Sequence, residues 1–477
     1  MNLNLEDINF KAVIANARIG ADDFIDVFIE NKVSTVLSNE SKRLEKAIKG
    51  LIQGAGIRLI SNKKTYYAYT NNIEEINLLN IASQLKKAAL SDIKNSEGNS
   101  QSKDINNVVL NFNEKKPKID FNRVKDVTEV SLDEKLNKIS PVVGYSWDYD
   151  KKVVQANITY SDYKQDVLII NSEGDLVKDY RENLAFLVNV VVSDGKKTEV
   201  GYESAGGFTG FEFFDANDPA YIAKKALDRA LSQLSAPFAP SGPMTVVLSS
   251  EAGGTMIHEA IGHGLEADIA GNGLSVYSDK IGEQVASNLI TVIDDSSLVG
   301  KRGFYRFDDE GTCSRKNILV QDGVLKKYMS DRLSYVKYGY ELTGNGRRQS
   351  YEHIPIVRMS NTMIAPGKTN PKDIIKSVEN GLFVKKMGGG QVNTVTGDFV
   401  FDVMEGYIIK KGIVQESVSG ATLIGNGPDI LKNIDMVGND LGFGIGTCGK
   451  DGQGAPVADA QPTLRIPSII VGGKNSK

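Results

Sequence analysis

The chain has 477 residues, 41% of them hydrophobic, and a formal net charge of −4, so it can bury substantial cores but carries no basic run that favours nucleic-acid binding. No stretch reaches the ~18 apolar residues of a membrane span, and the polar first segment does not resemble a signal peptide. Two cysteines are too few for a disulfide framework, so we expect a cytoplasmic protein without a membrane partner.

The N-terminal part of the chain combines helical and strand patterns. Apolar residues recur at helical spacing in three segments, and runs rich in β-branched and aromatic residues predict strands between them. We predict helices over residues 9–19, 44–53 and 76–89, and strands over 24–30, 33–37 and 66–70.

A polar segment follows at residues 91–107 and predicts a flexible excursion. A short helix is predicted over 132–138. Alternating apolar and polar residues between 153 and 206 then predict a β-meander, with turns at 173–174 and 194–195.

A helix start and a proline-rich joint mark the middle of the chain. Asp218 followed by Pro219 is typical of a helix cap and first turn. The joint, residues 237–243, contains three prolines and ends this helical region. We place the main domain boundary there, which gives domains over residues 1–237 and 238–477.

Just after this boundary lie two of the three histidines, His258 and His263, in the sequence HEAIGH. Two imidazoles can supply most of a zinc coordination sphere, and Glu259 beside them can activate a metal-bound water. A five-residue spacing separates the histidines by about 140° on an ideal α-helix. A single π-bulge would return both to one face, and Gly262 and Gly264 let the backbone loosen there. We favour a metal site over a helix with two unrelated histidines.

Several residues are candidates for a third ligand. Glu266 and Asp268 follow the motif, His353 lies in a segment whose alternation suggests a strand, and Cys313 and Cys448 are the two cysteines. Cys448 lies in a glycine-rich loop, GFGIGTCGKDGQG, that can approach a metal from another part of the fold. Because thiolate is a good zinc ligand, the residues alone favour Cys448 slightly over His353. The alternative is a small buried residue in a turn.

The second half of the chain is rich in glycine and in short strand patterns. The glycines at 388–390 predict a turn before an alternating strand, and Lys411-Gly412 predicts a hairpin. The predicted fold class is α+β, with a mixed α/β N-terminal domain. The C-terminal domain is predicted to be strand-rich and largely antiparallel, carrying a short metal-binding helix.

Charged residues elsewhere in this half are weaker candidates. Arg347 and Arg348, near the third histidine, are candidates for contacting a substrate carboxylate, although arginines at the surface are commoner. The same caution applies to Asp308 and Asp309. No P-loop lysine follows the glycine-rich segments, so we do not predict nucleotide binding.

A series of ordered segments carries a resemblance to a known family. The longest are VVLSSEAGGTMIHEAIGHGLEAD, SVYSDKIGEQVAS, TGNGRRQSYEHIPIVRMSNT, GGGQVNTVTGDFVF and TCGKDGQGAPVADAQPTLRIPSI, and VIDD, RFDDEGT and YMSDRLS lie between them. Together they resemble the TldD/PmbA family of metallopeptidases, in its TldD-like branch that retains the HExxxH motif. The resemblance covers nearly the whole chain and is densest in the second half. It implies that His258, His263 and Cys448 bind zinc and that Glu259 is the catalytic acid and base.

The resemblance also implies an activity and partners. We expect a zinc-dependent peptidase that hydrolyses unfolded or short peptides, in peptide maturation or turnover. A metal-activated water would attack the peptide carbonyl while Glu259 accepts its proton and later delivers it to the leaving amine. We expect a homodimer, or a heterodimer with a PmbA/TldE-like paralogue. A strand-rich domain suggests that the substrate binds extended, as an added strand at a sheet edge.

The main alternative is a non-catalytic regulatory or interaction protein with a structural metal site, as the family's label of DNA gyrase modulator suggests. A pure scaffold needs no water-activating glutamate, and a structural zinc site would have four protein ligands. A metal-dependent hydrolase acting on another bond is a further alternative, because ligands and base do not specify an amide.

Overall fold

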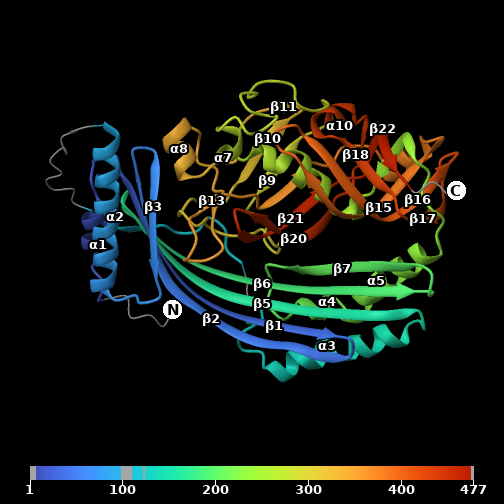
Figure 1. Cartoon of the computed structure of the whole chain (residues 1–477), viewed down its shortest axis with the longest axis horizontal. Helices are drawn as coiled ribbons and strands as arrows, with labels where there is room; N and C mark the ends of the chain where they lie inside the picture. Colours follow the sequence, from blue (N-terminus) through green and yellow to red (C-terminus); the bar gives the residue numbers. More distant parts are fainter. Residues whose placement is uncertain (1–6, 98–109, 122–123, 474–477) are drawn as a thin grey trace.

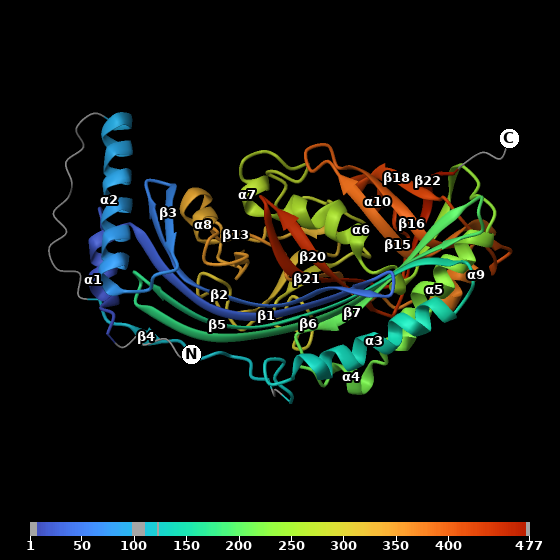
Figure 2. The same cartoon turned by 60° about the horizontal axis from the view of Figure 1, so that its bottom comes forward.

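The computed structural model describes residues 7–97, 110–121 and 124–473. In this part of the chain, the long strands of the N-terminal half form one curved sheet. The C-terminal half lies over the concave face of that sheet (Figures 1 and 2). The fold is α+β, as predicted.

The N-terminal sheet has the strand order β3-β2-β1-β5-β6, with β4 and β7 both paired to β6. The β-meander predicted over residues 153–206 is confirmed as β5, β6 and β7, with Gly174 and Gly195 in the turns at positive φ. The strands are β1 Phe24–Glu40, β2 Arg43–Ser61, β3 Lys64–Thr70, β4 Asn113–Glu114, β5 Val153–Asn171, β6 Asp175–Ser193 and β7 Thr198–Gly207.

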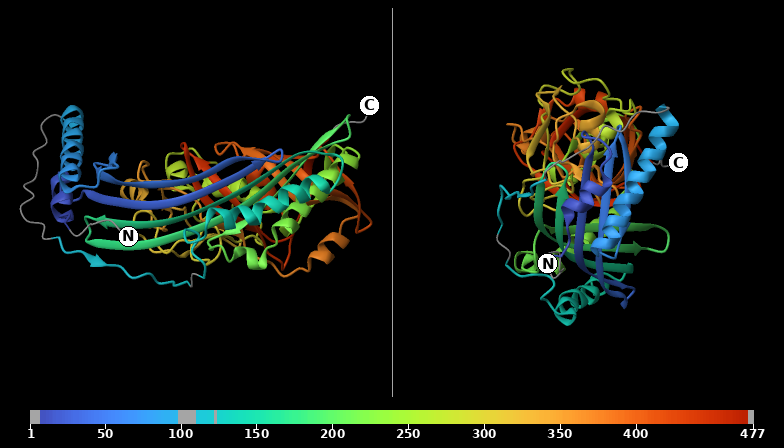
Figure 3. Two further views of the ribbon diagram at one scale, coloured as in Figure 1. Left: turned by 90° about the horizontal axis from the view of Figure 1, so that it is seen from below. Right: turned by 90° about the vertical axis from the view of Figure 1, so that its left-hand side faces the viewer.

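Two helix pairs flank this sheet. The first two helices pack together at one end, and α3 and α5 pack together on the convex face (Figure 3). α5 also contacts β16 and β17 of the C-terminal half. The helix predicted to start at Asp218-Pro219 is confirmed, and the Asp218 side chain accepts a hydrogen bond from the Ala220 amide. The helices are α1 Phe10–Ala17, α2 Glu75–Glu97, α3 Leu132–Asp148, α4 Phe213–Ala216 and α5 Pro219–Ser235.

The helix predicted over residues 44–53 is wrong, because this segment belongs to β2. Ser41 and Lys42 both have positive φ, and their turn pairs β1 with β2 along almost the whole length of both strands. Leu44, Ile48 and Leu51, whose spacing suggested a helix, are 47%, 55% and 64% exposed, so they form no buried helical face. The same pairing joins the two predicted strands at 24–30 and 33–37 into one.

Part of the predicted excursion at 91–107 lies outside the described residues. Residues 91–97 form the last turns of α2, and residues 98–109 are not described. The short helix predicted over 132–138 is longer than expected, because α3 continues through Pro141 to Asp148.

The C-terminal half contains two larger sheets. A six-stranded sheet has the order β11-β10-β9-β14-β21-β20, which leaves β20 at its edge. A second sheet has the order β15-β8-β22-β18-β16-β17, and the additional pairing of β15 with β16 closes five of its strands into a ring. Most pairs are antiparallel, as predicted, but β8 with β15 and β14 with β21 are parallel.

The bounds of these strands and helices are as follows. The strands are β8 Gly242–Leu248, β9 Val292–Asp295, β10 Lys316–Gln321, β11 Val324–Leu325, β12 Gly346–Arg347, β13 Ile356–Val357, β14 Asn361–Ile364, β15 Asn380–Val392, β16 Asp398–Lys410, β17 Ile413–Val418, β18 Thr422–Asn426, β19 Met436–Val437, β20 Gly442–Lys450, β21 Gln453–Gln461 and β22 Leu464–Gly472. The helices are α6 Thr255–Ile257, α7 Ala267–Ala270, α8 Arg332–Tyr338, α9 Pro371–Lys376 and α10 Gly427–Asn433.

Two turn predictions in this half have different outcomes. The hairpin at Lys411-Gly412 is confirmed between β16 and β17, with both residues at positive φ. The turn predicted at residues 388–390 is wrong, because these glycines lie within β15 opposite an irregular stretch of β16. At Gly390 a Cβ would lie 1.8 Å from the Phe401 ring, so the glycine is needed for strand packing.

We propose that the chain divides near Pro237, because the three largest buried apolar clusters separate there. The largest cluster draws its buried members from residues 239–471, and two others draw theirs from 37–234 and 10–170. Among the described residues, no helix is both long and apolar enough to cross a membrane.

A buried ionic network joins the two halves. The Arg58 guanidinium on β2 lies 2.5 Å from Asp26 on β1 and 2.7 Å from Glu310 of the C-terminal half, and all three side chains are at most 1% exposed. Arg181 on β6 reaches Asp309 at 2.6 Å. These pairs fix the sheet against the loop that contains residues 308–310.

Candidate metal centre

The two motif histidines lie on one face of a π-helical turn, His258–Gly262, which follows α6. The His263 amide donates to the His258 carbonyl, five residues earlier, which is the bonding pattern of a π-bulge. The ring centroids are 4.9 Å apart and nearly perpendicular. The predicted π-bulge is therefore confirmed.

The two glycines of the motif serve packing here. A Cβ on Gly262 would lie 2.3 Å from the Met359 sulfur, and one on Gly264 would lie 2.7 Å from the Tyr277 ring. Neither glycine has a positive φ, so both are required by close approach and not by backbone conformation.

Cys448 on the edge strand β20 completes a group of three donors. Ligand atoms of His258, His263 and Cys448 all lie within 4.8 Å of one another, and Cys448 Sγ is 3.6 Å from His263 Nε2. The three side chains therefore converge from a helical turn and a strand that are 185 residues apart.

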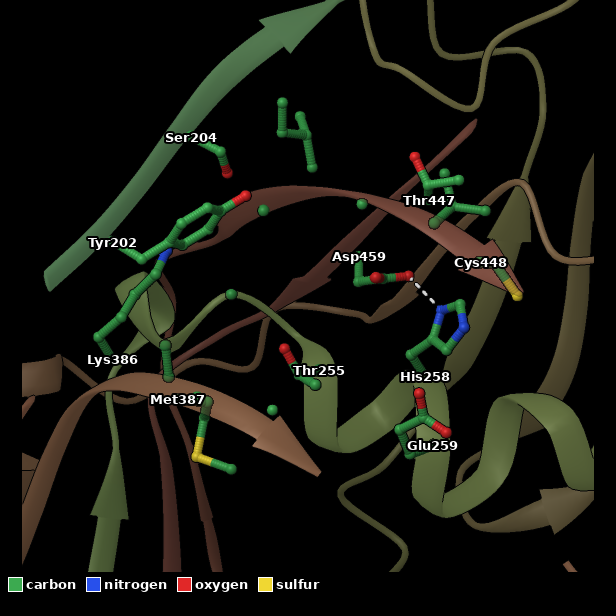
Figure 4. A pocket seen from close by; sticks show the side chains of 18 of the residues that line it. Tyr202, Ser204, Thr255, His258, Glu259, Lys386, Met387, Thr447, Cys448 and Asp459 are labelled. Carbon is green, nitrogen blue, oxygen red and sulfur yellow. Dashed lines mark hydrogen bonds and ion pairs between the residues drawn. The ribbon is translucent and has the colours of Figure 1, made fainter. Parts of the chain in front are cut away.

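Each histidine is oriented by a carboxylate. Asp459 on β21 lies 2.8 Å from His258 Nδ1 (Figure 4), and Glu266 lies 2.8 Å from His263 Nδ1. When Nδ1 donates to a carboxylate, Nε2 carries the lone pair that binds a metal. Two imidazole nitrogens and a thiolate, each imidazole held by a carboxylate, fit a zinc ion.

The charge balance of the site favours a thiolate. Burial alone would raise the pKa of Cys448, but hydrogen bonds to both histidines and their positive charge lower it to about 5. Burial opposes a cationic His263, but the Glu266 charge and the contact with Cys448 raise its pKa to about 10. Burial also opposes a cationic His258, but the charge of Asp459 and its hydrogen bond raise the pKa of His258.

Lys450, two residues after the cysteine, holds the outer carboxylates. Its Nζ lies 3.0 Å from Glu266 and 2.7 Å from Asp268. Against the effect of burial, Lys450 and His263 lower the pKa of Glu266 to about 2. Burial raises the pKa of Asp268 to about 6, although Lys450 opposes this. Glu266 and Asp268 are therefore held by Lys450 next to the three converging donors and are not among them.

Glu259 lies beside the three donors and lines the same pocket (Figure 4). Burial raises its pKa, while the charges of His258 and His263 oppose the rise. A carboxylate with a raised pKa next to a metal site is suited to exchanging protons with a substrate.

The pocket has a volume of about 380 Å³, and residues of both halves line it. Figure 4 shows Tyr202 and Ser204 on β7 facing the donors across the pocket, with Lys386 on β15 at its end. The backbone of β20 forms one wall, from Gly444 to Gly449. The site therefore lies between the two halves of the chain.

The other proposed ligands lie elsewhere. His353 is in a turn between β12 and β13, not on a strand, and its Nδ1 is 2.9 Å from the Ser350 hydroxyl. Cys313 packs against the cluster around Phe28. Neither belongs to the group of three donors found among the described residues.

The arginines suggested as substrate contacts are also absent from this pocket. Arg347 donates to the carbonyls of Met359 and Pro456. Arg348 is buried, and it donates to Asp26 and to the Asp309 carbonyl. Asp309 belongs to the ionic network between the two halves. These residues are structural here, and they are not at the surface.

Sequence reasoning missed Asp459, which lies 201 residues from its partner histidine. It also missed Arg358, which is fully buried and donates to the Cys448 carbonyl. Neither residue has a local spacing signal, because each reaches the site through a contact with a residue at least 90 positions away in the sequence.

Three family models match the chain in order. They are described as PmbA/TldA metallopeptidase domain 1, the central domain and the C-terminal domain, and they match residues 25–91, 125–234 and 241–473. Solved structures share the fold. A putative modulator of a DNA gyrase from Thermotoga maritima has a TM-score of 0.77 at 20% identity, covering 97% of this chain and 99% of that one. TldE from Thermococcus kodakarensis has a TM-score of 0.74 at 19% identity, covering 97% and 100%.

Curated relatives match over most of their length. A metalloprotease TldD homolog of Haemophilus influenzae is 37% identical over 89% of this chain and 87% of its own. A TldD homolog of Buchnera aphidicola is 35% identical over 94% and 93%. A zinc metalloprotease TldD homolog of Saccharolobus solfataricus is 26% identical over 97% and 99%. The chain is a metallopeptidase and belongs to the PmbA/TldD family.

Proposed function

We propose that this chain is a zinc-dependent peptidase that hydrolyses unfolded or short peptides. His258, His263 and Cys448 would hold the metal, and Glu259 would act as general base and acid. The observation that carries the proposal is the convergence of three donor atoms within 4.8 Å at the wall of an open pocket. A relative called a zinc metalloprotease supports the choice of metal.

When bound, zinc would supply a Lewis acid that polarises a peptide carbonyl and makes water more acidic. Glu259 would accept a proton from the attacking water and deliver it to the leaving amine. Asp459 and Glu266 would hold the imidazoles in the tautomer that binds metal. With three protein ligands, one coordination position is left for the reaction, which a structural zinc site lacks.

We propose that the substrate binds extended along β20. This strand is the edge of its sheet, and its backbone lines the pocket from Gly444 to Gly449. Gly446 and Gly449 lie in this wall with no atom closer than 3.5 Å to the place of a Cβ, so no side chain covers the backbone there and an extended peptide could pair with it. Recognition of the main chain suits unfolded peptides of varied sequence. A bound peptide seen as a helix, or without main-chain pairing to β20, would remove this part of the proposal.

We also propose that the working form is a dimer, either with itself or with a PmbA/TldE-like paralogue. The structural similarity to TldE supports a related partner chain of the same fold. Analytical ultracentrifugation of the chain alone, and then mixed with such a paralogue, tests this. A monomer in both experiments would contradict it.

The first experiment compares zinc content and cleavage of casein or an unstructured peptide in the intact protein and in Glu259→Gln. We expect about one zinc in both and cleavage only by the intact protein. Glu251→Gln is the matched control, because Glu251 is an exposed glutamate a few residues earlier. If both forms bind zinc and neither cleaves, the assay is repeated with the paralogue. Absence of zinc from protein purified without chelators would refute the site assignment.

A further inference from the structure

A second cavity adjoins the pocket at the metal centre. It also has a volume of about 380 Å³, and it shares the residues Tyr202, Ile445, Gly446 and Thr447 with the first. The two cavities therefore continue into one another along β20. The second cavity is also lined by Ser161, Ala185 and Leu187 of the N-terminal sheet and by Arg302.

Arg302 is the charged residue of this second cavity. Its Nε donates to the Gly446 carbonyl at 3.2 Å, and one terminal nitrogen donates to the Asn183 side chain at 3.4 Å. Both contacts are long, and a guanidinium has five N–H groups. No carboxylate among the described residues pairs with Arg302, so some of its N–H groups are left to donate to a ligand.

Other arginines between the two halves do have acidic partners. Arg58, Arg181 and Arg229 each contact two acidic side chains. The charged and phenolic groups that face Arg302 are Tyr163, Tyr202 and Arg347, none of which is an acid at neutral pH. Burial lowers the pKa of Arg302, as expected for a cation without a counter-ion.

The preceding residue, Lys301, is a second cation of the same kind. The Lys301 ammonium lies 4.0 Å from the centroid of the Phe443 ring on β20, and burial lowers its pKa. No acid within the described part of the chain pairs with it. Two successive cations therefore flank β20 without anions of their own, next to the proposed path of the substrate.

We propose that Arg302 binds a carboxylate of the peptide substrate, and so sets a preference for where the chain is cut. This inference rests on the proposed peptidase function. A carboxylate accepts two parallel hydrogen bonds from a guanidinium, which gives both affinity and direction. Arg302 contacts Gly446, two residues before Cys448, and a strand rises ~3.3 Å per residue. The carboxylate therefore lies about two residues from the bond that is cleaved.

The carboxylate has two sources, the free C-terminus of a peptide and an Asp or Glu side chain. A set of short Gly/Ala/Ser peptides with a quenched fluorophore separates them. In one series the C-terminus is free or amidated, and in another a single Glu or Gln is moved along the chain. Loss of preference on amidation identifies the terminus, and loss on changing Glu to Gln identifies the side chain.

We expect the intact, zinc-loaded protein to prefer one carboxylate peptide over its neutral counterpart by roughly ten- to a hundred-fold in kcat/KM, chiefly through KM. In Arg302→Gln the ratio of kcat/KM between the carboxylate peptide and its neutral counterpart should fall to below about two-fold. Arg302→Lys should keep part of the preference. The control Arg43→Gln, at an exposed position on β2, should keep all of it.

Peptide binding to zinc-loaded Glu259→Gln, followed by fluorescence anisotropy, separates the two proposals. Equal affinity of charged and neutral peptides would overturn the role of Arg302, even if the intact protein cleaves both. Carboxylate-selective binding that depends on Arg302 would support it, even if the intact protein cleaves neither and the peptidase proposal fails. The selectivity of the intact protein is itself a test, so the inference does not depend on the folding of one variant.

Discussion

Replacing Asp459 by asparagine or alanine tests whether this carboxylate orients a metal ligand. Its oxygen lies 2.8 Å from Nδ1 of His258, which is only 5% exposed. Asparagine can still accept from Nδ1, but a neutral acceptor is roughly half as strong as a charged one. Alanine leaves a buried N–H without its partner, which costs about 1–3 kcal/mol. We therefore expect zinc affinity to fall about ten-fold in Asp459→Asn and about a hundred-fold in Asp459→Ala.

The assay is competition for zinc between the protein and a chromophoric chelator. Asp451→Asn is the control, because Asp451 is exposed in the turn of the same hairpin and asparagine tolerates its positive φ. Near-ultraviolet circular dichroism verifies that each variant is folded. If folded Asp459→Ala binds zinc within about two-fold of the intact protein, Asp459 does not orient a metal ligand.

Three further predictions follow from the structure. Arg58→Met leaves Glu310 buried without its cation and leaves Asp26 with Arg348 alone, so the free energy of unfolding should drop by about 3–5 kcal/mol. A change below about 1 kcal/mol in urea unfolding would contradict this. Gly262→Ala places a Cβ 2.3 Å from the Met359 sulfur, so it should abolish stoichiometric zinc binding, measured by metal analysis. Zinc added to chelator-treated protein at pH 7 should release protons, because both histidines of the metal centre have raised pKa values and must bind as neutral imidazoles. Calorimetry in buffers of different ionisation enthalpy measures this release, and affinity should weaken as the pH falls.

The sequence predicted elements whose signals are local. The cap at Asp218-Pro219, the hairpin at Lys411-Gly412 and the π-bulge between the histidines each depend on neighbouring residues. In contrast, the segment 44–53 has helical spacing but forms a strand. Its pairing with β1 begins at a turn of serine and lysine, which are not typical residues for positive φ.

At the candidate site, too, the local features were predictable from the sequence and the long-range contacts were not. The spacing of the histidines pointed to a shared face, but residue chemistry alone barely separated Cys448 from His353 as a third donor. The difference depends on β20 pairing with β21, which brings both Cys448 and Asp459 to the histidine turn. The residues alone favoured Cys448 only slightly, the family resemblance indicated it clearly, and no signal in the sequence indicated Asp459.

The order in which the metal centre is assembled has a consequence for the enzyme during its own synthesis. The histidine turn is translated well before β20 and β21, because its partners lie 185 and 201 residues later in the chain. Domains near the N-terminus fold first as the chain emerges at ~5–20 residues per second. A partly made chain thus exposes the folded N-terminal sheet and the two histidines without the third donor. On the proposed assignment, the three donors and Asp459 are therefore all present only when nearly all of the chain has been made.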